Sequence, residues 1–303
     1  MKIQISILIA LNIILITDSF SQVRRQNDIN LDLTTIYEHG FDTDIDDGGE
    51  VSVNRYSVRG TASTNFSKSY GLDINTSYSF TDFDFSGSSG FAGLNPWEGI
   101  NQARLGFRLK YIINPEWGIS SGPFIKYAGE QGADFSDSLT YGGLAGFTYS
   151  PSRNFFLGTG VYISSRLEDD VIAYPGLIMN WMVSERLRLS TLLTGVRSEL
   201  GPRVQINYKV TEKIDTAIST GYEFQRFRLD GDGTAPDGIG EVKVLPVWAS
   251  IGYGVSDYLR LELYSGLGFI GELELEDSNG SRIDKEDFDT MVFVGLGVKI
   301  NNI

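Results

Sequence analysis

The segment Gln102–Tyr111 carries a charged, polar or glycine residue at every second position. Apolar Ala103, Leu105, Phe107, Leu109 and Tyr111 alternate there with Gln102, Arg104, Gly106, Arg108 and Lys110. A period of two residues is that of a β-strand, whose successive side chains point to opposite faces. A face that carries Arg104, Arg108 and Lys110 cannot pack on a dry apolar core, because burying unpaired charge is unfavourable. The strand therefore has one apolar face and one hydrated or ion-paired face.

The same alternation recurs along the chain, most regularly in Leu72–Phe80 and in the hairpin Val242–Phe269. In that hairpin the apolar face contains Val247, Ile251 and Leu261, whereas Arg260 and Glu262 lie on the other face. We count about 14 such strands, within a range of about 12 to 16, because strand boundaries are the least certain part of a sequence-based assignment.

The connections between these strands alternate in length. Acidic, polar connections (residues 39–50, 86–99, 129–138, 165–171, 229–241 and 276–287) are separated by short turns, three of which share the pattern V-[ST]-[DE]-x-[LI] at residues 183–187, 210–214 and 255–259. Aromatic residues such as Tyr70, Tyr111, Trp117 and Trp181 lie beside the short turns. This asymmetry and this aromatic girdle are typical of outer-membrane barrels. We therefore predict an all-β fold, a closed antiparallel transmembrane β-barrel with short periplasmic turns and long extracellular loops. A soluble β-sandwich is the alternative, and it would require its apolar faces to meet.

The first residues predict export. Lys2 precedes an apolar run from Ile3 to Ile16, and small residues Ser19 and Ser21 come before Gln22. This order is that of a secretory signal peptide, and the run is shorter than a membrane-spanning helix requires. We predict a signal peptide over residues 1–21 and one barrel domain over residues 22–303. The absence of cysteine excludes disulfides and thiol chemistry.

The signal peptide, the repeated turns, the alternating strands and the final segment VFVGLGVKI resemble those of Gram-negative outer-membrane β-barrel proteins. The segment Ser164–Asp170 with Tyr174-Pro175-Gly176 further resembles a barrel family that has no assigned function. This resemblance implies location in the outer membrane, with lipid, lipopolysaccharide and the barrel-assembly machinery as partners. The last strand of such barrels ends in an aromatic residue, whereas this chain ends in Asn301-Asn302-Ile303, which departs from the assembly signal.

The net charge argues against one class of partner, and the histidine content argues against one class of enzyme. A formal charge of −14 argues against nucleic acid as a partner, because phosphate binding requires a basic surface. His39 is the single histidine, so a Ser–His or Asp–His hydrolase would depend on it. An exposed loop histidine is the simpler interpretation, and we predict that the protein is not an enzyme.

Two acidic segments have the oxygen-rich composition of calcium loops. Asp42, Asp44 and Asp46 alternate with other residues, and Asp230 and Asp232 repeat the pattern. Neither segment fits the EF-hand template. These segments are either solvated acidic loops or Ca²⁺ sites, and we predict no other cofactor.

Charged residues on the polar face of the strands are the remaining candidates for a functional role. The candidates for the lining of the lumen are Arg59, Asp73, Arg104, Arg108, Lys110, Arg188, Arg203, Lys209, Asp215, Arg260, Glu262 and Lys299. Such residues either line an aqueous passage or pair across strands and fill the lumen.

About fourteen strands are enough to enclose a lumen. We expect a pore for small polar solutes or a structural surface barrel. The alternative is a transporter of hydrophobic ligands, suggested by Phe83, Phe85 and Phe91 near a loop, and an outer-membrane hydrolase is a more distant possibility.

Overall fold

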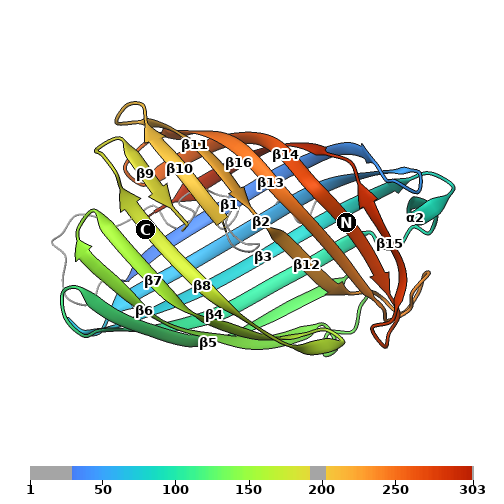
Figure 1. The fold of residues 1–303 in the computed structure, drawn as a ribbon, viewed down its shortest axis with the longest axis horizontal. Helices are drawn as coiled ribbons and strands as arrows, with labels where there is room; N and C mark the ends of the chain where they lie inside the picture. Colours follow the sequence, from blue (N-terminus) through green and yellow to red (C-terminus); the bar gives the residue numbers. More distant parts are fainter. Residues whose placement is uncertain (1–28, 192–202, 302–303) are drawn as a thin grey trace, which may run out of the picture.

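The computed structural model describes residues 29–191 and 203–301, and these form one antiparallel sheet closed into a barrel (Figure 1). Its strands are β1 (Asn30–Asp44), β2 (Glu50–Asn65), β3 (Tyr70–Ser86), β4 (Gly99–Ile112), β5 (Trp117–Glu130), β6 (Leu139–Ser152), β7 (Phe155–Arg166), β8 (Asp169–Met182), β9 (Leu187–Ser190), β10 (Arg203–Lys209), β11 (Ile214–Gly221), β12 (Glu223–Arg228), β13 (Ile239–Gly254), β14 (Leu259–Glu276), β15 (Arg282–Phe288) and β16 (Met291–Ile300). The short helix α2 (Gly90–Gly93) lies between β3 and β4. No helix among the described residues is long and apolar enough to cross a membrane.

Pairing of the first and last strands closes the barrel. β1 pairs with β16 from Leu33↔Ile300 to Gly40↔Phe293, and β16 pairs with β14 on its other edge. β12 follows β11 after Tyr222, and β15 precedes β16 by two residues, so each pair forms one interrupted strand of the wall. The barrel therefore has 14 strands, which confirms the predicted architecture.

The apolar faces point outward, as predicted. Leu261 and Leu263 are 39% and 58% exposed, whereas Glu262 between them is 3% exposed. Pairs of aromatic rings, Tyr70–Tyr111 and Trp117–Tyr149, lie beside the short turns with ring centroids 4.8 and 4.6 Å apart. A monomer in water would expose this continuous apolar belt, whereas a bilayer covers it.

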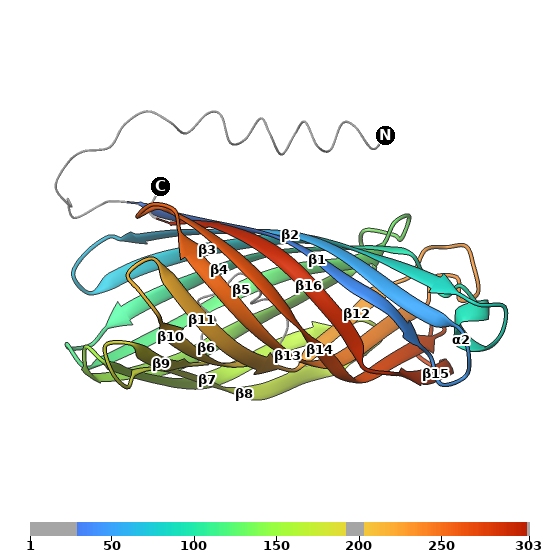
Figure 2. The same cartoon turned by 90° about the horizontal axis from the view of Figure 1, so that it is seen from above.

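The repeated turn pattern has a local cause. In each copy the hydroxyl of the second residue (Ser184, Thr211 or Ser256) accepts hydrogen bonds from the backbone N–H groups two and three residues later. This arrangement satisfies N–H groups that the hairpin leaves unpaired, as Ser and Thr side chains commonly do in turns. We call this end of the barrel the turn end and the opposite end the mouth. Figure 2 shows α2 and β15 at the mouth, β12 between the mouth and the middle of the barrel, and β9 to β11 toward the turn end.

Several predicted mouth loops are shorter in the structure. β1 continues to Asp44 and β2 begins at Glu50, so His39 lies within a strand instead of at the start of a loop. The predicted loop 276–287 contains most of β15. Strands lengthen here because backbone pairing continues after the apolar alternation has ended, so the side-chain pattern does not mark it. The predicted signal peptide lies outside the described residues.

Near the mouth, four strand segments pack against other parts of the barrel wall across the interior. We call them the mouth sheet: β12, residues 239–244 of β13, residues 271–276 of β14, and β15. The register shifts between Lys243 and Leu245, opposite Ile270, whose φ is 53°. This bulge exchanges the two faces of β14, so that Leu273 and Leu275 turn toward the lumen. At its tip β12 pairs with Gly129 of β5, on another part of the wall.

Candidate binding site inside the barrel

The inward face of the mouth sheet forms an apolar core with the barrel wall. Phe227, Val242, Leu273 and Leu275 pack against side chains of the wall and of the α2 connection: Val51, Phe83, Phe91, Trp97 and Ile100. The Trp97 ring lies edge-on to the rings of Phe227 and Phe91, with centroids 5.3 and 5.5 Å apart. This core is located in what the sequence predicted to be a lumen, and it fills the mouth. Phe83, Phe85 and Phe91, the residues that suggested hydrophobic ligands, pack in this core.

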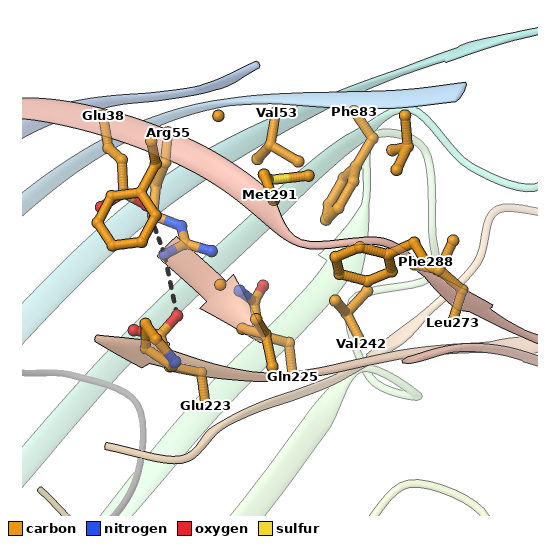
Figure 3. A pocket seen from close by; sticks show the side chains of 16 residues that line it. Glu38, Val53, Arg55, Phe83, Glu223, Gln225, Val242, Leu273, Phe288 and Met291 are labelled. Atoms are coloured by element: carbon orange, nitrogen blue, oxygen red, sulfur yellow. Dashed lines mark hydrogen bonds and ion pairs between the residues drawn. The ribbon is translucent and has the colours of Figure 1, made fainter. Parts of the chain in front are cut away.

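A pocket with a cavity volume of about 50 Å³ lies beside this core (Figure 3). Most of its wall is apolar, and includes Val53, Val242, Val244, Phe288 and Met291. The remaining wall is polar and consists of Glu38, Arg55, Glu223 and Gln225. The pocket therefore offers an apolar space that has one polar end.

Ion pairs between different strands form the polar end. Arg55 of β2 donates to Glu38 of β1 at 3.3 Å and to Glu223 of β12 at 3.4 Å, the contact marked in Figure 3. Arg203 of β10 donates to the other oxygen of Glu223 at 3.2 Å and lies over the Trp248 ring. Glu38, Arg203 and Glu223 are at most 6% exposed. Four mutually neutralising charges thus cross the interior below the apolar pocket.

A further contact joins β12 to the wall. The amide of Gln102 in β4 donates to the side-chain oxygen of Gln225 at 3.4 Å, and both residues are buried. β12 thus contacts β2, β4 and β5, which are far from it in strand order. The mouth of the barrel is closed by a strand that lies across it.

The outward face of the mouth sheet is charged and is covered by the β7–β8 connection. Arg226 binds both oxygens of Glu276 and also donates to Glu241 and to the Leu167 carbonyl. Arg228 binds Glu168, and Arg166 of β7 donates to Glu241 at 3.1 Å. Because both faces of the mouth sheet are engaged, the inward position is held from two sides.

Three carboxylates of the mouth sheet, Glu241, Glu272 and Glu274, form the one group in the described chain whose oxygens lie close enough for a metal ion. The ammonium of Lys243 already lies 2.5, 2.6 and 3.6 Å from them. A side-chain cation therefore takes the position that a metal would take, and the group is explained as an ion-pair cluster.

The acidic segments that suggested calcium do not join this group. The N–H of Asp232 donates to Asp230, whose own N–H donates to Glu130. The backbones of Asp44 and Asp46 instead form hydrogen bonds with those of Asp289 and Asp287, at the ends of β1 and β15. None of Asp42, Asp44, Asp46, Asp230 and Asp232 belongs to a described cluster of three close carboxylates.

Several of the predicted lumen residues pair with neighbours on the inner wall. Arg108 and Lys110 of β4 both bind Asp73 of β3, which is 1% exposed. Arg260 binds Asp215 across Gly252, where an added Cβ would require the Arg260 guanidinium to move. The sequence thus indicated residues that the structure brings together in two clusters.

The remaining predicted lumen residues are placed separately. Arg104 lies over the Phe124 ring at 4.4 Å, and Lys209 binds the exposed Glu212 at the turn end. Lys299 lies within electrostatic reach of Asp32, Glu262 and Arg59. Arg188 is half-buried in β9, and Arg203 belongs to the polar end of the pocket. Outside the lumen, His39 lies 2.9 Å from Asn54 and packs on Phe41.

Among the residues that form the polar end of the pocket, only Arg203 was predicted to line the lumen. One signal was available: the segment EFQRFR (β12) has polar residues on both of its faces, as a strand with lipid on one side would not. Which wall residues it would meet is not a local property of the sequence.

Comparison with solved structures identifies the architecture. A FadL homologue of Pseudomonas aeruginosa matches with a TM-score of 0.53 and 12% identity, over 90% of each chain. The fold is that of an outer-membrane β-barrel. The P. putida toluene transporter TodX matches with a TM-score of 0.42 and 11% identity, over 92% of this chain and 91% of that one. The KdgM porin matches with a TM-score of 0.35 and 10% identity, over 88% and 98%. No protein-family model and no curated protein matches this barrel. At such identities the likeness concerns the fold alone.

Proposed function

We propose that this barrel passes small molecules with an apolar body across the outer membrane, and that the pocket under the mouth sheet binds them on the way. The observation that carries the proposal is the pocket itself, which is apolar over most of its wall and lies inside a membrane barrel. Ligand sites of this kind combine apolar walls with a few polar groups that orient the ligand. Among the alternatives raised by the sequence, this is the hydrophobic-ligand transporter.

A passage for small polar solutes is the second candidate, and the charged inner wall toward the turn end favours it. Such a passage requires polar groups along its whole length. In the closed arrangement, the apolar core around Phe227 and Trp97 interrupts that path. A polar solute therefore passes only if the mouth sheet moves away from the wall.

We further propose export by the segment 1–21, insertion by the barrel-assembly machinery, and contact with lipid and lipopolysaccharide. The exposed apolar belt supports the contact with lipid. Ca²⁺ at the acidic segments around Asp44 and Asp230 is a separate proposal, which titration of the purified protein with Ca²⁺ would test. We propose no catalytic role for the barrel.

Hexanol binding to the purified barrel tests the pocket. Val53 lines the pocket, whereas Val58 of the same strand faces outward and is 37% exposed. We expect Val53→Phe to weaken hexanol binding by about tenfold or more, because the added ring fills the apolar space. Val58→Phe is the matched control and should bind as the wild type does. Equal hexanol binding by both variants would refute the site.

Planar-bilayer recordings separate the two candidates. An apolar route predicts little or no steady ion current, because the mouth core excludes hydrated ions. Large, steady, salt-dependent openings of the wild-type barrel would favour the passage for polar solutes.

A further inference from the structure

Glu223 connects the mouth sheet to two arginines that come from separate parts of the wall. It is the first residue of β12, directly after the interruption at Tyr222. Its carboxylate lies 3.4 Å from Arg55 on β2 and 3.2 Å from Arg203 on β10. With an exposure of 1%, it is among the most buried carboxylates of the described chain. A buried carboxylate depends strongly on such partners, because water does not replace them.

Arg55 is less fully engaged than its burial would suggest. Its contacts with Glu38 and Glu223 are 3.3 and 3.4 Å long, whereas charge-assisted hydrogen bonds of this kind are commonly about 2.7–2.9 Å. Both contacts use the same nitrogen, Nη1, and the Nε atom has no hydrogen-bond partner. Arg226 differs, because it binds Glu276 through two nitrogens and uses its Nε as well. The Arg55 guanidinium therefore has N–H donors left for a competing anion.

Arg55 also lines the pocket, next to the apolar wall. An anion whose apolar body lies against Val53 and Val242 would bring its charged end to this guanidinium. A carboxylate has the planar geometry that a guanidinium binds through two parallel hydrogen bonds. An ammonium group, in contrast, would meet the Arg55 cation.

We propose that Glu223 holds the position of a ligand carboxylate, and that a small apolar carboxylate entering the pocket displaces it from Arg55 and releases β12. This inference rests on the proposed function and adds the ligand class and the trigger. Once displaced, Glu223 keeps Arg203 but loses Arg55, so the inward position of β12 becomes less favourable. The remaining inner-face contacts of β12 are the Gln102–Gln225 hydrogen bond, its short pairing with β5 and the packing of Phe227 in the apolar core.

Hexanoate, hexanol and hexylammonium, which share one apolar body, test the ligand class by titration of the full-length barrel in detergent. We expect the wild type to prefer hexanoate over hexylammonium. In Glu223→Gln, hexanoate should bind about tenfold more tightly because its competitor is removed, while hexanol binding stays within about twofold. Arg55→Gln should lose the preference for hexanoate. Asp73→Asn is the matched control, since Asp73 is an equally buried, paired carboxylate outside the pocket lining, and it should bind all three probes as the wild type does.

A second readout reports release of the strand and does not depend on affinity. The chain has no cysteine, so Phe224→Cys introduces a unique thiol on β12 at a half-buried position outside the pocket lining. We expect hexanoate to speed the reaction of this thiol with a maleimide several-fold and hexanol to leave it unchanged, with Ser256→Cys at the exposed turn as a constant reference. If Glu223→Gln folds poorly, Glu223→Asp takes its place in the titrations. Its side chain is shorter by one methylene, and we expect its hexanoate affinity to lie between those of the wild type and Glu223→Gln.

The outcomes separate this inference from the function on which it rests. If hexanol and hexanoate both fail to bind, the proposed function fails. If hexanol binds, but removal of the Glu223 carboxylate leaves hexanoate affinity unchanged or hexylammonium is preferred, the inference fails alone. Unchanged thiol reactivity in the presence of bound hexanoate would refute release of β12.

Discussion

Arg226 of β12 donates two hydrogen bonds to the carboxylate of Glu276 in β14, although 50 residues separate them in the sequence. The Nη1–Oε1 and Nη2–Oε2 distances are 2.8 and 2.5 Å. The Arg226 side chain is 6% exposed, and it also contacts Glu241 and the Leu167 carbonyl. The hydrogen bond to the Leu167 carbonyl joins the outward face of the mouth sheet to the β7–β8 connection. It holds the mouth sheet in place from the side opposite to the pocket.

Removing this arginine should destabilise the mouth sheet strongly. We expect Arg226→Gln to lower the free energy of unfolding by about 3–5 kcal/mol, because Glu276 would remain buried without its cation, whereas Glu241 keeps Arg166 and Lys243. Urea unfolding in detergent micelles measures the change. Lys209→Gln is the control, since its pair with the exposed Glu212 should contribute at most about 1 kcal/mol. Similar losses in both variants would contradict the assigned role of Arg226.

The orientation of β14 predicts the effect of a charge on its outer face. Leu261→Arg places a cation on the lipid side, which should cost about 2–4 kcal/mol near the bilayer midplane and less near the interface. Folding equilibria in lipid vesicles measure this cost. Asp257→Arg, in the adjacent exposed turn, should have little effect. An unchanged stability of Leu261→Arg would mean that this face does not contact lipid.

Ile270 predicts a stabilising substitution. Its φ of 53° is unfavourable for a β-branched residue, and its side chain is 79% exposed, so little packing is lost on replacement. Ile270→Gly should raise the free energy of unfolding by about 1 kcal/mol, because glycine adopts this conformation without steric cost. Ile283→Gly, at an exposed strand position of β15, should instead destabilise. A loss of stability in Ile270→Gly would show that the side chain has another role at the bulge.

Glu130 predicts a pH dependence at the mouth, outside the membrane-spanning part of β5. Burial raises its pKa above 4.5, and the nearby Asp230 and Glu98 charges act in the same direction, although two backbone N–H groups that donate to it oppose them. A raised carboxyl pKa contributes stability that is complete below the unfolded pKa and is lost as pH rises through the folded value. The melting temperature of the wild type should therefore fall relative to that of Glu130→Gln as pH rises above 4.5. Parallel pH profiles would contradict this assignment.

The charged inner wall predicts ion selectivity in whatever current the barrel carries. Arg104 and Arg108 lie on the inner face of β4, so replacing both by Gln should shift the preference toward cations. Reversal potentials in planar bilayers with a salt gradient measure it, and Lys68→Gln in an exposed turn is the control. Unchanged selectivity would leave these arginines a structural role, which the Asp73–Arg108 pair already indicates.

The sequence by itself determined the barrel, its strand number and the outward face of each long strand. These follow from local rules: a period of two places Leu261 and Glu262 on opposite faces wherever the strand lies, and the Ser/Thr turns form their hydrogen bonds within a few residues. The sequence also marked charged partners such as Asp73 and Arg108, because neighbouring strands of a hairpin bring them together.

Only the tertiary structure decided that the mouth is closed and that it contains an apolar pocket. The bulge at Ile270 exchanges the faces of β14, so the alternation read along that strand no longer tells inside from outside. The contact between Arg55 and Glu223 joins residues 168 positions apart on strands that are not neighbours. No local period encodes such a pair, because it forms only when the closed barrel brings β12 against β2.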